Sequence, residues 1–207
     1  MIRNILVTGG SGRLGSFVCP YLKGLGYNVA SCDIVPPKPG TPNVEAGIPF
    51  IKVDLLNIGD ILKALLLVQA DAVVHLGAIP GSSELQPMFE DNSWRGYAKE
   101  GRRYSYGRCE EDYTMRDNTM GTFYVLDACR RVGVKTVVAA SSFFVYGMGS
   151  RISGNDFVPQ TIPITEDHPC EPEDTYSLSK LLNEITMQSF ARAYDMNCIA
   201  MRLLGVY

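Results

Sequence analysis

The sequence predicts an α/β fold in which helices cover both faces of a doubly wound parallel sheet. Three observations support this prediction. Short, almost continuously apolar runs alternate with longer segments of helical periodicity, as is typical of strands buried on both faces. A glycine-rich turn follows the first apolar run, and the second run leads to an aspartate. Alternating strands and helices imply parallel strands joined by crossover helices.

Six apolar, β-rich segments are predicted as strands, at residues 4–8, 28–32, 50–53, 72–75, 134–140 and 198–202. Four segments between them are predicted as helices, at 13–25, 58–68, 118–132 and 175–194. In the third helix, Phe123, Leu126 and Cys129 recur at helical spacing, and Gly133 follows as a stop signal. Two long tracts, 82–115 and 148–172, interrupt the alternation. Loops of this length in a compact domain are either functional or disordered.

Size and charge limit the classes of function. The chain of 207 residues is expected to form one domain with a sizeable core. Its formal net charge of −3 gives no basic surface of the kind that nucleic-acid-binding proteins need. Basic residues gather at Arg102, Arg103 and Arg108, but acidic residues 110–112 follow at once, a pattern typical of a mixed-charge loop.

The cysteine pattern and the lack of long apolar runs indicate the cellular compartment of the protein. Six cysteines are scattered without a C-x-x-C pair, so the sequence predicts neither a metal site nor a disulfide framework, and a reducing compartment is favoured. The N-terminus has no signal-peptide layout, and no apolar run approaches the ~20 residues of a membrane span. We therefore expect a cytoplasmic protein that neither crosses membranes nor binds nucleic acid.

The glycine-rich turn TGGSGRLG, residues 8–15, closes the first predicted strand and opens the first predicted helix. Gly9, Gly12 and Gly15 allow a tight turn, a close approach of the backbone to a pyrophosphate, and close packing of helix on strand. Arg13 and Leu14 complete the turn at the start of the helix, whose free N–H groups point at the anion. In this position the pattern is a strong signal for a dinucleotide site.

Asp33 ends the second strand, eighteen residues after Gly15. A carboxylate in this position binds the adenosine ribose hydroxyls and repels a 2′-phosphate, which favours NAD over NADP as the cofactor. The alternative interpretation is that Asp33 forms a turn before the two prolines at 36 and 37.

Several ordered motifs together resemble one family. They are TGGSGRLG (8–15), Asp33, VDLL (53–56), HLGA (75–78), NTMGT (118–122), SSFFVYG (141–147), YSLSK (176–180) and RLLGVY (202–207). On these motifs the chain resembles an extended short-chain dehydrogenase/reductase, the NAD-dependent epimerase/dehydratase family, from residue 4 to its last residue with interruptions. The resemblance implies a Rossmann fold and NAD as the cofactor.

The resemblance also implies a role for each motif. Asp54 and Leu55 would flank the adenine, and Leu76, Gly77 and Ala78 would line the cofactor beneath the fourth strand. Asn118 would lie near the nicotinamide ribose. The catalytic residues would be Ser142, Tyr176 and Lys180, and the last two would also contact the cofactor.

The chemistry of Tyr176 and Lys180 can be argued from their spacing. Residues i and i+4 share a helix face, so the ammonium lies one turn from the phenol. Oxidation of an alcohol needs a base near neutral pH, and an unperturbed tyrosine, with a pKa of ~10, is too weakly acidic. The ammonium and a positive nicotinamide are expected to lower that pKa, while Ser142 holds the reacting oxygen against the phenol. Without the other motifs, the pair is an ordinary surface helix pair.

Two side-chain differences from the family pattern narrow the substrate. Phe143 and Phe144 replace the acidic pair that dehydratases of the family carry, and apolar rings cannot transfer protons, so dehydratase activity is not expected. Gly205 replaces an asparagine that meets the substrate diphosphate in many members that bind nucleotide sugars, which weakens a nucleotide-sugar assignment.

Two differences concern length. The family usually continues for ~100 or more residues into a substrate-binding lobe, so the chain is expected to be truncated at residue 207 and to lack most of that lobe. The connection between His75 and Asn118 is longer than usual, and residues 91–115 are expected to be an insertion. The predicted domain is therefore one NAD(P)-binding domain over 1–207.

Two functions follow from the sequence. The first is an NAD-dependent oxidoreductase or epimerase that acts on a sugar, sugar nucleotide or similar polyol, with Tyr176 as the base. The alternative is a truncated, non-catalytic NAD-binding protein. The resemblance further implies a possible homodimer through helices 118–132 and 175–194.

Overall fold

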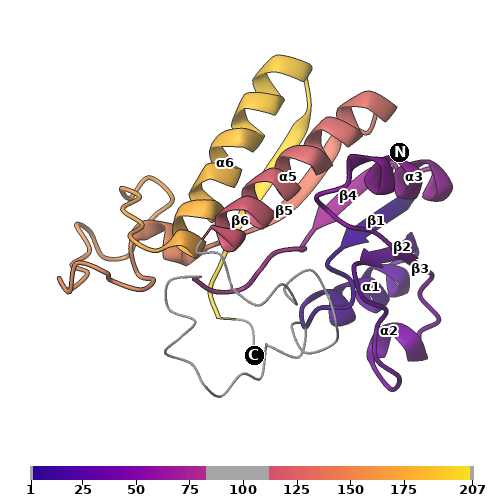
Figure 1. Ribbon diagram of the computed structural model, residues 1–207, viewed down its shortest axis with the longest axis horizontal. Helices are drawn as coiled ribbons and strands as arrows, with labels where there is room; N and C mark the ends of the chain where they lie inside the picture. Colours follow the sequence, from indigo (N-terminus) through magenta and orange to yellow (C-terminus); the bar gives the residue numbers. More distant parts are fainter. Residues whose placement is uncertain (1, 83–111, 206–207) are drawn as a thin grey trace.

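The computed structural model describes residues 2–82 and 112–205. Within these ranges six strands form one sheet in the order β3-β2-β1-β4-β5-β6, and every neighbouring pair is parallel (Figure 1). The predicted α/β fold with a parallel sheet is confirmed. The strands are β1 (Asn4–Thr8), β2 (Asn28–Asp33), β3 (Phe50–Lys52), β4 (Ala72–His75), β5 (Thr136–Ser142) and β6 (Asn197–Leu203).

The helices connect these strands as crossovers. They are α1 (Gly15–Gly24), α2 (Pro42–Glu45), α3 (Ile58–Val68), α5 (Tyr113–Val132), the 3₁₀ helix η3 (Phe143–Tyr146) and α6 (Thr175–Tyr194). None of the helices in the described ranges is long and apolar enough to cross a membrane.

Two hydrophobic clusters hold the layers together. On one face, α3, α5 and α6 pack beside one another, and Leu65, Leu126 and Met187 join the core of the sheet. On the other face, Cys19 of α1 packs against Val7 and Val29. The helices therefore lie on both faces, as a doubly wound sheet requires.

The coverage of the second face decreases across the sheet. Val7, Val74, Val138 and Ile199 are register partners on neighbouring strands from β1 to β6. Val7 is fully buried, Val74 and Val138 are half-buried, and Ile199 is 47% exposed. Thus α1 shields this face over β1, whereas none of the described elements shields it over β6.

Most predicted boundaries agree with the structure. The bounds of β1, β4, α3 and α6 match those predicted, and β2 continues one residue further, to Asp33. The prediction for α5 was too short, because the helix begins at Tyr113 rather than at residue 118. Neither α2 nor η3 was predicted. The expected insertion at 91–115 lies outside the described residues except for its last positions, of which 113–115 belong to α5.

The sheet order determines where a ligand can bind. The chain runs outward from β1 in one direction through β2 and β3, and then crosses back to β4 and continues through β5 and β6. In open α/β sheets, ligands bind beyond the carboxyl ends of the strands at the point where the order reverses. In this protein that point lies between the ends of β1 and β4, at Thr8 and His75.

Candidate active site

The glycine-rich turn lies at the end of β1. Gly9 has a φ of +68°, and a Cβ there would lie 2.5 Å from the backbone nitrogen of Gly77. A Cβ at Gly15 would collide with the carbonyl oxygen of Gly9 and the Cα of Gly10. The turn can therefore adopt this path only with glycine, which brings Gly9, Gly12 and Gly15 together at the start of α1, as predicted.

Asn43 supports this turn, although no sequence pattern indicated this role. Its side chain is fully buried, and its Nδ2 donates to the carbonyl oxygen of Gly10 at 2.7 Å. The same amide lies near the thiol of Cys19 and favours its ionised form, although burial raises the pKa of that thiol to about 11. Asn43 therefore links α2 to the glycine turn and to α1. No local pattern distinguishes it from other loop asparagines.

Asp33 lies beside the same turn. Its Oδ2 accepts from the backbone nitrogen of Ser11 at 3.2 Å, and its Oδ1 accepts from that of Ile34 at 2.7 Å. The carboxylate at the end of β2 is thus held next to the turn, in the position where a ribose contact was predicted.

The segment after β4 forms the neighbouring wall. Leu76 donates its backbone N–H to the carbonyl oxygen of Thr8 at 3.1 Å, and Gly77 donates to the Thr8 Oγ1 at 3.2 Å. The side chain of Leu55 packs against Gly77 and Gly121. The structure therefore brings residues 76–78 and Leu55 together beside the glycine turn.

Asp54 is positioned by the first residues of the following helix region. Its Oδ1 accepts from the backbone nitrogen of Leu56 at 2.8 Å, and its own N–H donates to the Asp60 Oδ2 at 3.1 Å. A contact of Asp54 with adenine stays a prediction.

Asn118 joins the loop after β4 to α6. It is 1% exposed, its Oδ1 accepts from the Ile79 backbone nitrogen at 2.7 Å, and its Nδ2 donates to the Ile79 carbonyl oxygen and to Ser179 Oγ. The amide thus fixes the loop after β4 against α6. A direct contact with a cofactor ribose stays a prediction.

Ser142, Tyr176 and Lys180 meet beyond the end of β5. Ser142 is 6% exposed, and its hydroxyl lies close enough to the Tyr176 phenol to lower the pKa of that phenol. The Lys180 Nζ lies 5.6 Å from the centre of the Tyr176 ring and donates to the Ala140 carbonyl oxygen at 2.8 Å. The structure therefore brings together the three residues that the sequence predicted as catalytic.

The pKa of Tyr176 is shifted in the direction opposite to the one expected from the sequence. Burial raises the pKa of the Tyr176 phenol, the nearby Ser142 hydroxyl lowers it, and the charge of Asp174 raises it further. Burial also lowers the pKa of Lys180 from 10.5 to about 8. The expected lowering of the Tyr176 pKa by the lysine is thus not produced by the protein alone, because the ammonium is directed to a backbone carbonyl and desolvation dominates.

An aromatic side chain lies next to the Tyr176 phenol. Phe144 meets Tyr176 edge to face at a centroid distance of 6.3 Å, and Phe143 lies 4.5 Å from Phe144. The phenol therefore has an apolar neighbour on the side where dehydratases of the resembled family would carry acidic groups.

His75 has a structural position. Its Nδ1 lies 2.7 Å from Thr8 Oγ1 and its Nε2 lies 3.0 Å from Thr122 Oγ1, and burial lowers its pKa to about 3. The neutral imidazole links β1, β4 and α5, as expected for a histidine that packs at the end of the fourth strand.

The residues assembled here fit a dinucleotide. A glycine turn that no Cβ could enter opens a helix, an acid ends the next strand, and the walls come from the strands on both sides of the reversal point. No group of three or more metal-ligating side chains occurs among the described residues.

A family model, described as the NAD dependent epimerase/dehydratase family, matches residues 5–87 and 103–207. UDP-glucose 4-epimerase of Azospirillum brasilense is 26% identical over 205 residues, which cover 98% of this chain and 49% of that protein. UDP-glucose 4-epimerase of Bacillus subtilis is 28% identical over 192 residues, which cover 87% of this chain and 45% of that protein.

Solved structures agree with this match. UDP-glucose 4-epimerase of Brucella ovis in complex with NAD superposes with a TM-score of 0.72 at 26% identity, covering 97% of this chain and 51% of that one. L-Threonine dehydrogenase of Clostridium difficile shares the fold, with a TM-score of 0.71 at 19% identity. The superposition covers 99% of this chain and 54% of that one. The chain spans about half the length of the relatives it matches.

Proposed function

The chain belongs to the NAD dependent epimerase/dehydratase family, and from this premise we propose that it binds NAD and catalyses redox chemistry on a sugar nucleotide. The observation that supports the chemistry best is the convergence of Ser142, Tyr176 and Lys180 beyond the end of β5, with the Lys180 Nζ 5.6 Å from the centre of the Tyr176 ring. UDP-glucose 4-epimerases among the relatives, and a 28% identical neighbour solved with UDP-glucose and NAD, support the substrate class.

The NAD would lie across the reversal point of the sheet. Its pyrophosphate would meet the turn at Gly9, Gly12 and Gly15, with Arg13 and Leu14 beside it, and its adenosine ribose would meet Asp33. The cofactor walls would be Asp54, Leu55 and residues 76–78. When bound, NAD supplies a hydride acceptor for a substrate alcohol.

The protein's own residues would handle the proton. Tyr176, as phenolate, would accept the proton of the substrate hydroxyl, while Ser142 holds that oxygen in place. Because burial raises the pKa of Tyr176, ionisation near neutral pH depends on nearby positive charge, and Lys180 is the cation that lies against the ring.

We also propose that residues 1–207 form one NAD-binding domain with an insertion at about 91–115.

The test compares two tyrosine substitutions. Tyr176→Phe should lower kcat for interconversion of UDP-glucose and UDP-galactose by roughly 10²- to 10⁴-fold, with NAD binding unchanged. Tyr124→Phe, on the partly buried side of α5, is the matched control and should leave both unchanged. Activity that survives in Tyr176→Phe would reject the proposed base. If the unaltered protein binds NAD in calorimetry but turns over no sugar nucleotide, the non-catalytic alternative is supported.

A homodimer is part of the proposal. The outer faces of α5 and α6 expose Met120, Phe123, Leu178 and Ile185, each at least 38% accessible. Pairing of these faces would bury them in a helical interface. Sedimentation of Phe123→Glu should show loss of the dimer, and an unchanged mass would place any association elsewhere.

A further inference from the structure

Asp174 is a buried carboxylate at the start of the helix that carries Tyr176. It is 2% exposed, and it is the N-cap of α6. Its Oδ1 accepts from the Ser177 backbone nitrogen at 2.9 Å and from Ser82 Oγ at 2.7 Å. Its Oδ2 accepts from Ser177 Oγ at 2.6 Å and from the Ser150 backbone nitrogen at 2.9 Å. Four donors thus converge on one side chain.

These donors come from three separate parts of the chain. Ser82 lies in the loop after β4, Ser150 lies in the loop after η3, and Ser177 lies in the first turn of α6. Gly149 packs directly on the carboxylate, because a Cβ there would lie 2.5 Å from Asp174 Oδ2 and against Ser177 Oγ. A capping aspartate normally serves only its own helix, so the contacts of Asp174 exceed what capping requires.

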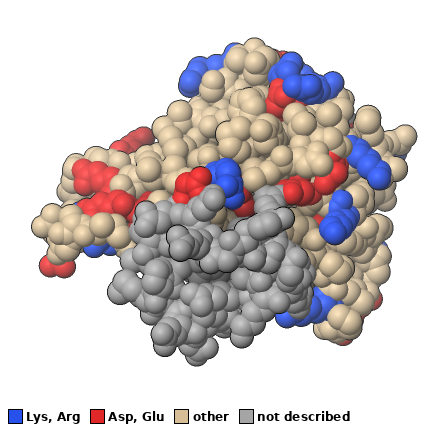
Figure 2. Space-filling view, in the orientation of Figure 1, with Lys and Arg blue, Asp and Glu red and all other residues tan. Residues whose placement is uncertain are grey.

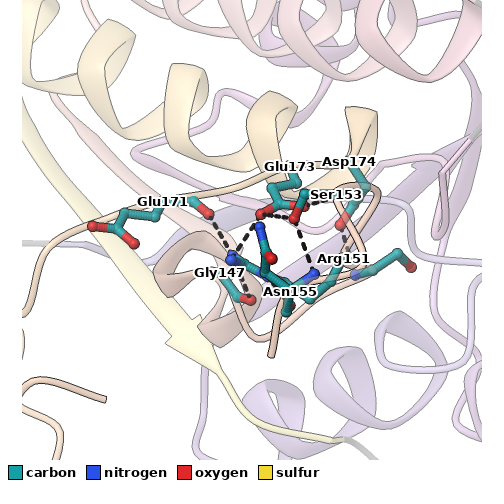
Figure 3. A network of polar contacts seen from close by, with 8 residues as sticks. Gly147, Arg151, Ser153, Asn155, Glu171, Glu173 and Asp174 are labelled. Carbon is teal, nitrogen blue, oxygen red and sulfur yellow. Dashed lines mark hydrogen bonds and ion pairs between the residues drawn. The ribbon is translucent and has the colours of Figure 1, made fainter. Parts of the chain in front are cut away.

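The neighbouring Glu173 gives a contrast. It pairs with Arg151 at 2.7 Å and accepts from Ser153, and its side chain is 22% exposed (Figure 3). Figure 3 shows both acids facing the 147–155 segment, but only Asp174 also binds α6 and the loop after β4. No lysine or arginine among the described residues forms an ion pair with Asp174. Its charge is instead stabilised by four neutral donors.

We propose that Asp174 is a positioning residue for Tyr176: it fixes the first turn of α6 against the loops after β4 and η3, so that the phenol stays on the Ser142 hydroxyl. The inference deepens the proposed function and rests on the role of Tyr176 as the base. Tyr176 follows Asp174 by two residues, within the turn that the carboxylate fixes. A displacement of about 1 Å at a reacting group can cost about a hundredfold in rate.

The groups around the phenol come from three elements. Ser142 of β5 lies beside it, Phe144 of η3 meets its ring, and Lys180 and Asp174 of the α6 region are the charged groups near it in the described part of the chain. The negative charge of Asp174 opposes ionisation of Tyr176. A variant that keeps this charge and removes one donor to Asp174 therefore isolates the loss of positioning.

The first experiment titrates the phenol by ultraviolet absorbance, with Tyr176→Phe subtracted as background, and it requires no turnover. In Ser82→Ala, which keeps the charge of Asp174 but removes one of its donors, the Tyr176 phenol should ionise at a higher pH, because it is held less firmly beside the Ser142 hydroxyl that lowers its pKa. Glu173→Gln removes one negative charge from the adjacent residue and should leave the titration unchanged. An unchanged titration in folded Ser82→Ala, or an equal shift in Ser82→Ala and Glu173→Gln, would overturn the proposal.

The second experiment separates positioning from binding. Asp174→Asn should lower kcat on UDP-glucose by about ten- to a hundredfold, while KM for NAD changes less than twofold, because the glycine turn is not touched. Should Asp174→Asn fail to fold, Ser82→Ala removes one donor from a remote loop and should lower kcat severalfold with the same unchanged KM. If Ser82→Ala leaves kcat as it was, the proposal is wrong. If Tyr176→Phe keeps its activity, the proposed function of Tyr176 as the base is rejected. The absorbance titration does not depend on activity, so it still tests whether Asp174 positions the phenol.

Discussion

At the scale of single residues, Lys180 shows how burial changes chemistry. Its side chain is 4% exposed, its Nζ donates to one backbone carbonyl, and burial lowers its pKa to about 8. A lysine with this pKa titrates close to physiological pH, which its position in the sequence did not indicate. The spacing from Tyr176 predicted the shared helix face, but desolvation depends on how β5 and α5 pack around it, which no local pattern records.

Lys180 should make stability depend on pH. The folded-state pKa is lower than the unfolded value of 10.5, so the unfolded state binds more protons between about pH 8 and 10.5. The contribution is therefore fully present above pH 10.5 and is lost as the pH falls through about 8. At about 1.4 kcal/mol per pH unit, the gain across this window is about 3 kcal/mol.

The measurement is denaturant unfolding at several pH values, with Lys180→Met as the reference. This difference cancels the buried cysteines, whose raised pKa values act in the opposite direction. A constant gap between the two proteins from pH 8 to 10.5 would contradict the buried, weakly basic lysine.

At the scale of elements, the long segments with clear periodicity were predictable and the short ones were not. The bounds of α3 and α6 followed from helical periodicity, and in the structure Asn57 and Asp174 cap these helices. By contrast, α2 has only four residues and η3 is a single turn after Ser142, so neither has a repeating pattern. Asn43 was missed for the same reason, since its role depends on a contact with Gly10 that only the folded chain creates.

The two glycines that bound α1 should respond differently to alanine. Gly15→Ala should abolish NAD binding, because its Cβ would overlap the Gly9 carbonyl oxygen and Gly10. Gly24→Ala has open space around the new methyl group and should keep NAD affinity, with stability raised by up to about 1 kcal/mol through the unfolded state. Calorimetric titration measures the NAD affinity of each variant, and thermal unfolding measures its stability. Equal NAD affinity in the two variants would contradict the role of the glycine-rich turn in binding NAD.

The contact between α6 and β6 depends on a buried ion pair. Arg202 Nη2 lies 2.7 Å from Glu184 Oε2, its guanidinium stacks on Tyr146 at 4.7 Å, and Glu184 also accepts from Ser141 Oγ. The Glu184 side chain is only 7% exposed. Arg202→Met leaves that carboxylate without its cation, and we expect a loss of about 3 to 5 kcal/mol in unfolding free energy. The double variant with Glu184→Gln should recover part of it in the same denaturant assay; full additivity of the two single changes would argue against coupling.

At the scale of the whole molecule, the surface combines two kinds of region. Figure 2 shows acidic and basic side chains interspersed over one face of the described part. Near β6 the surface is more apolar, with Ile199 47%, Met201 38% and Leu204 70% exposed. Parallel sheets are normally covered on both faces, so this apolar strip is unusual for the fold. The sequence did not predict this strip, because the almost continuously apolar strand segments indicated a sheet with both faces buried.

The strip should promote self-association as concentration rises. Ile199→Lys places a charge on it and should lower light scattering at high protein concentration, with no change in NAD affinity. Val158→Lys, at a loop position that is 77% exposed, is the control for an added charge alone. Equal scattering by the two variants would contradict a special role for the β6 strip.

The strand order also has a consequence for the order in which the sheet assembles. The β1–β2 pairing joins Asn4 to Asn28, whereas the β4–β5 pairing joins Ala72 to Thr136, across a loop nearly three times as long. Chain entropy makes the longer closure costlier by about 1 kcal/mol, before any contact within the loop offsets it. The half formed by β3, β2 and β1 can therefore close first, so that the glycine turn exists before Tyr176 and Ser142 meet.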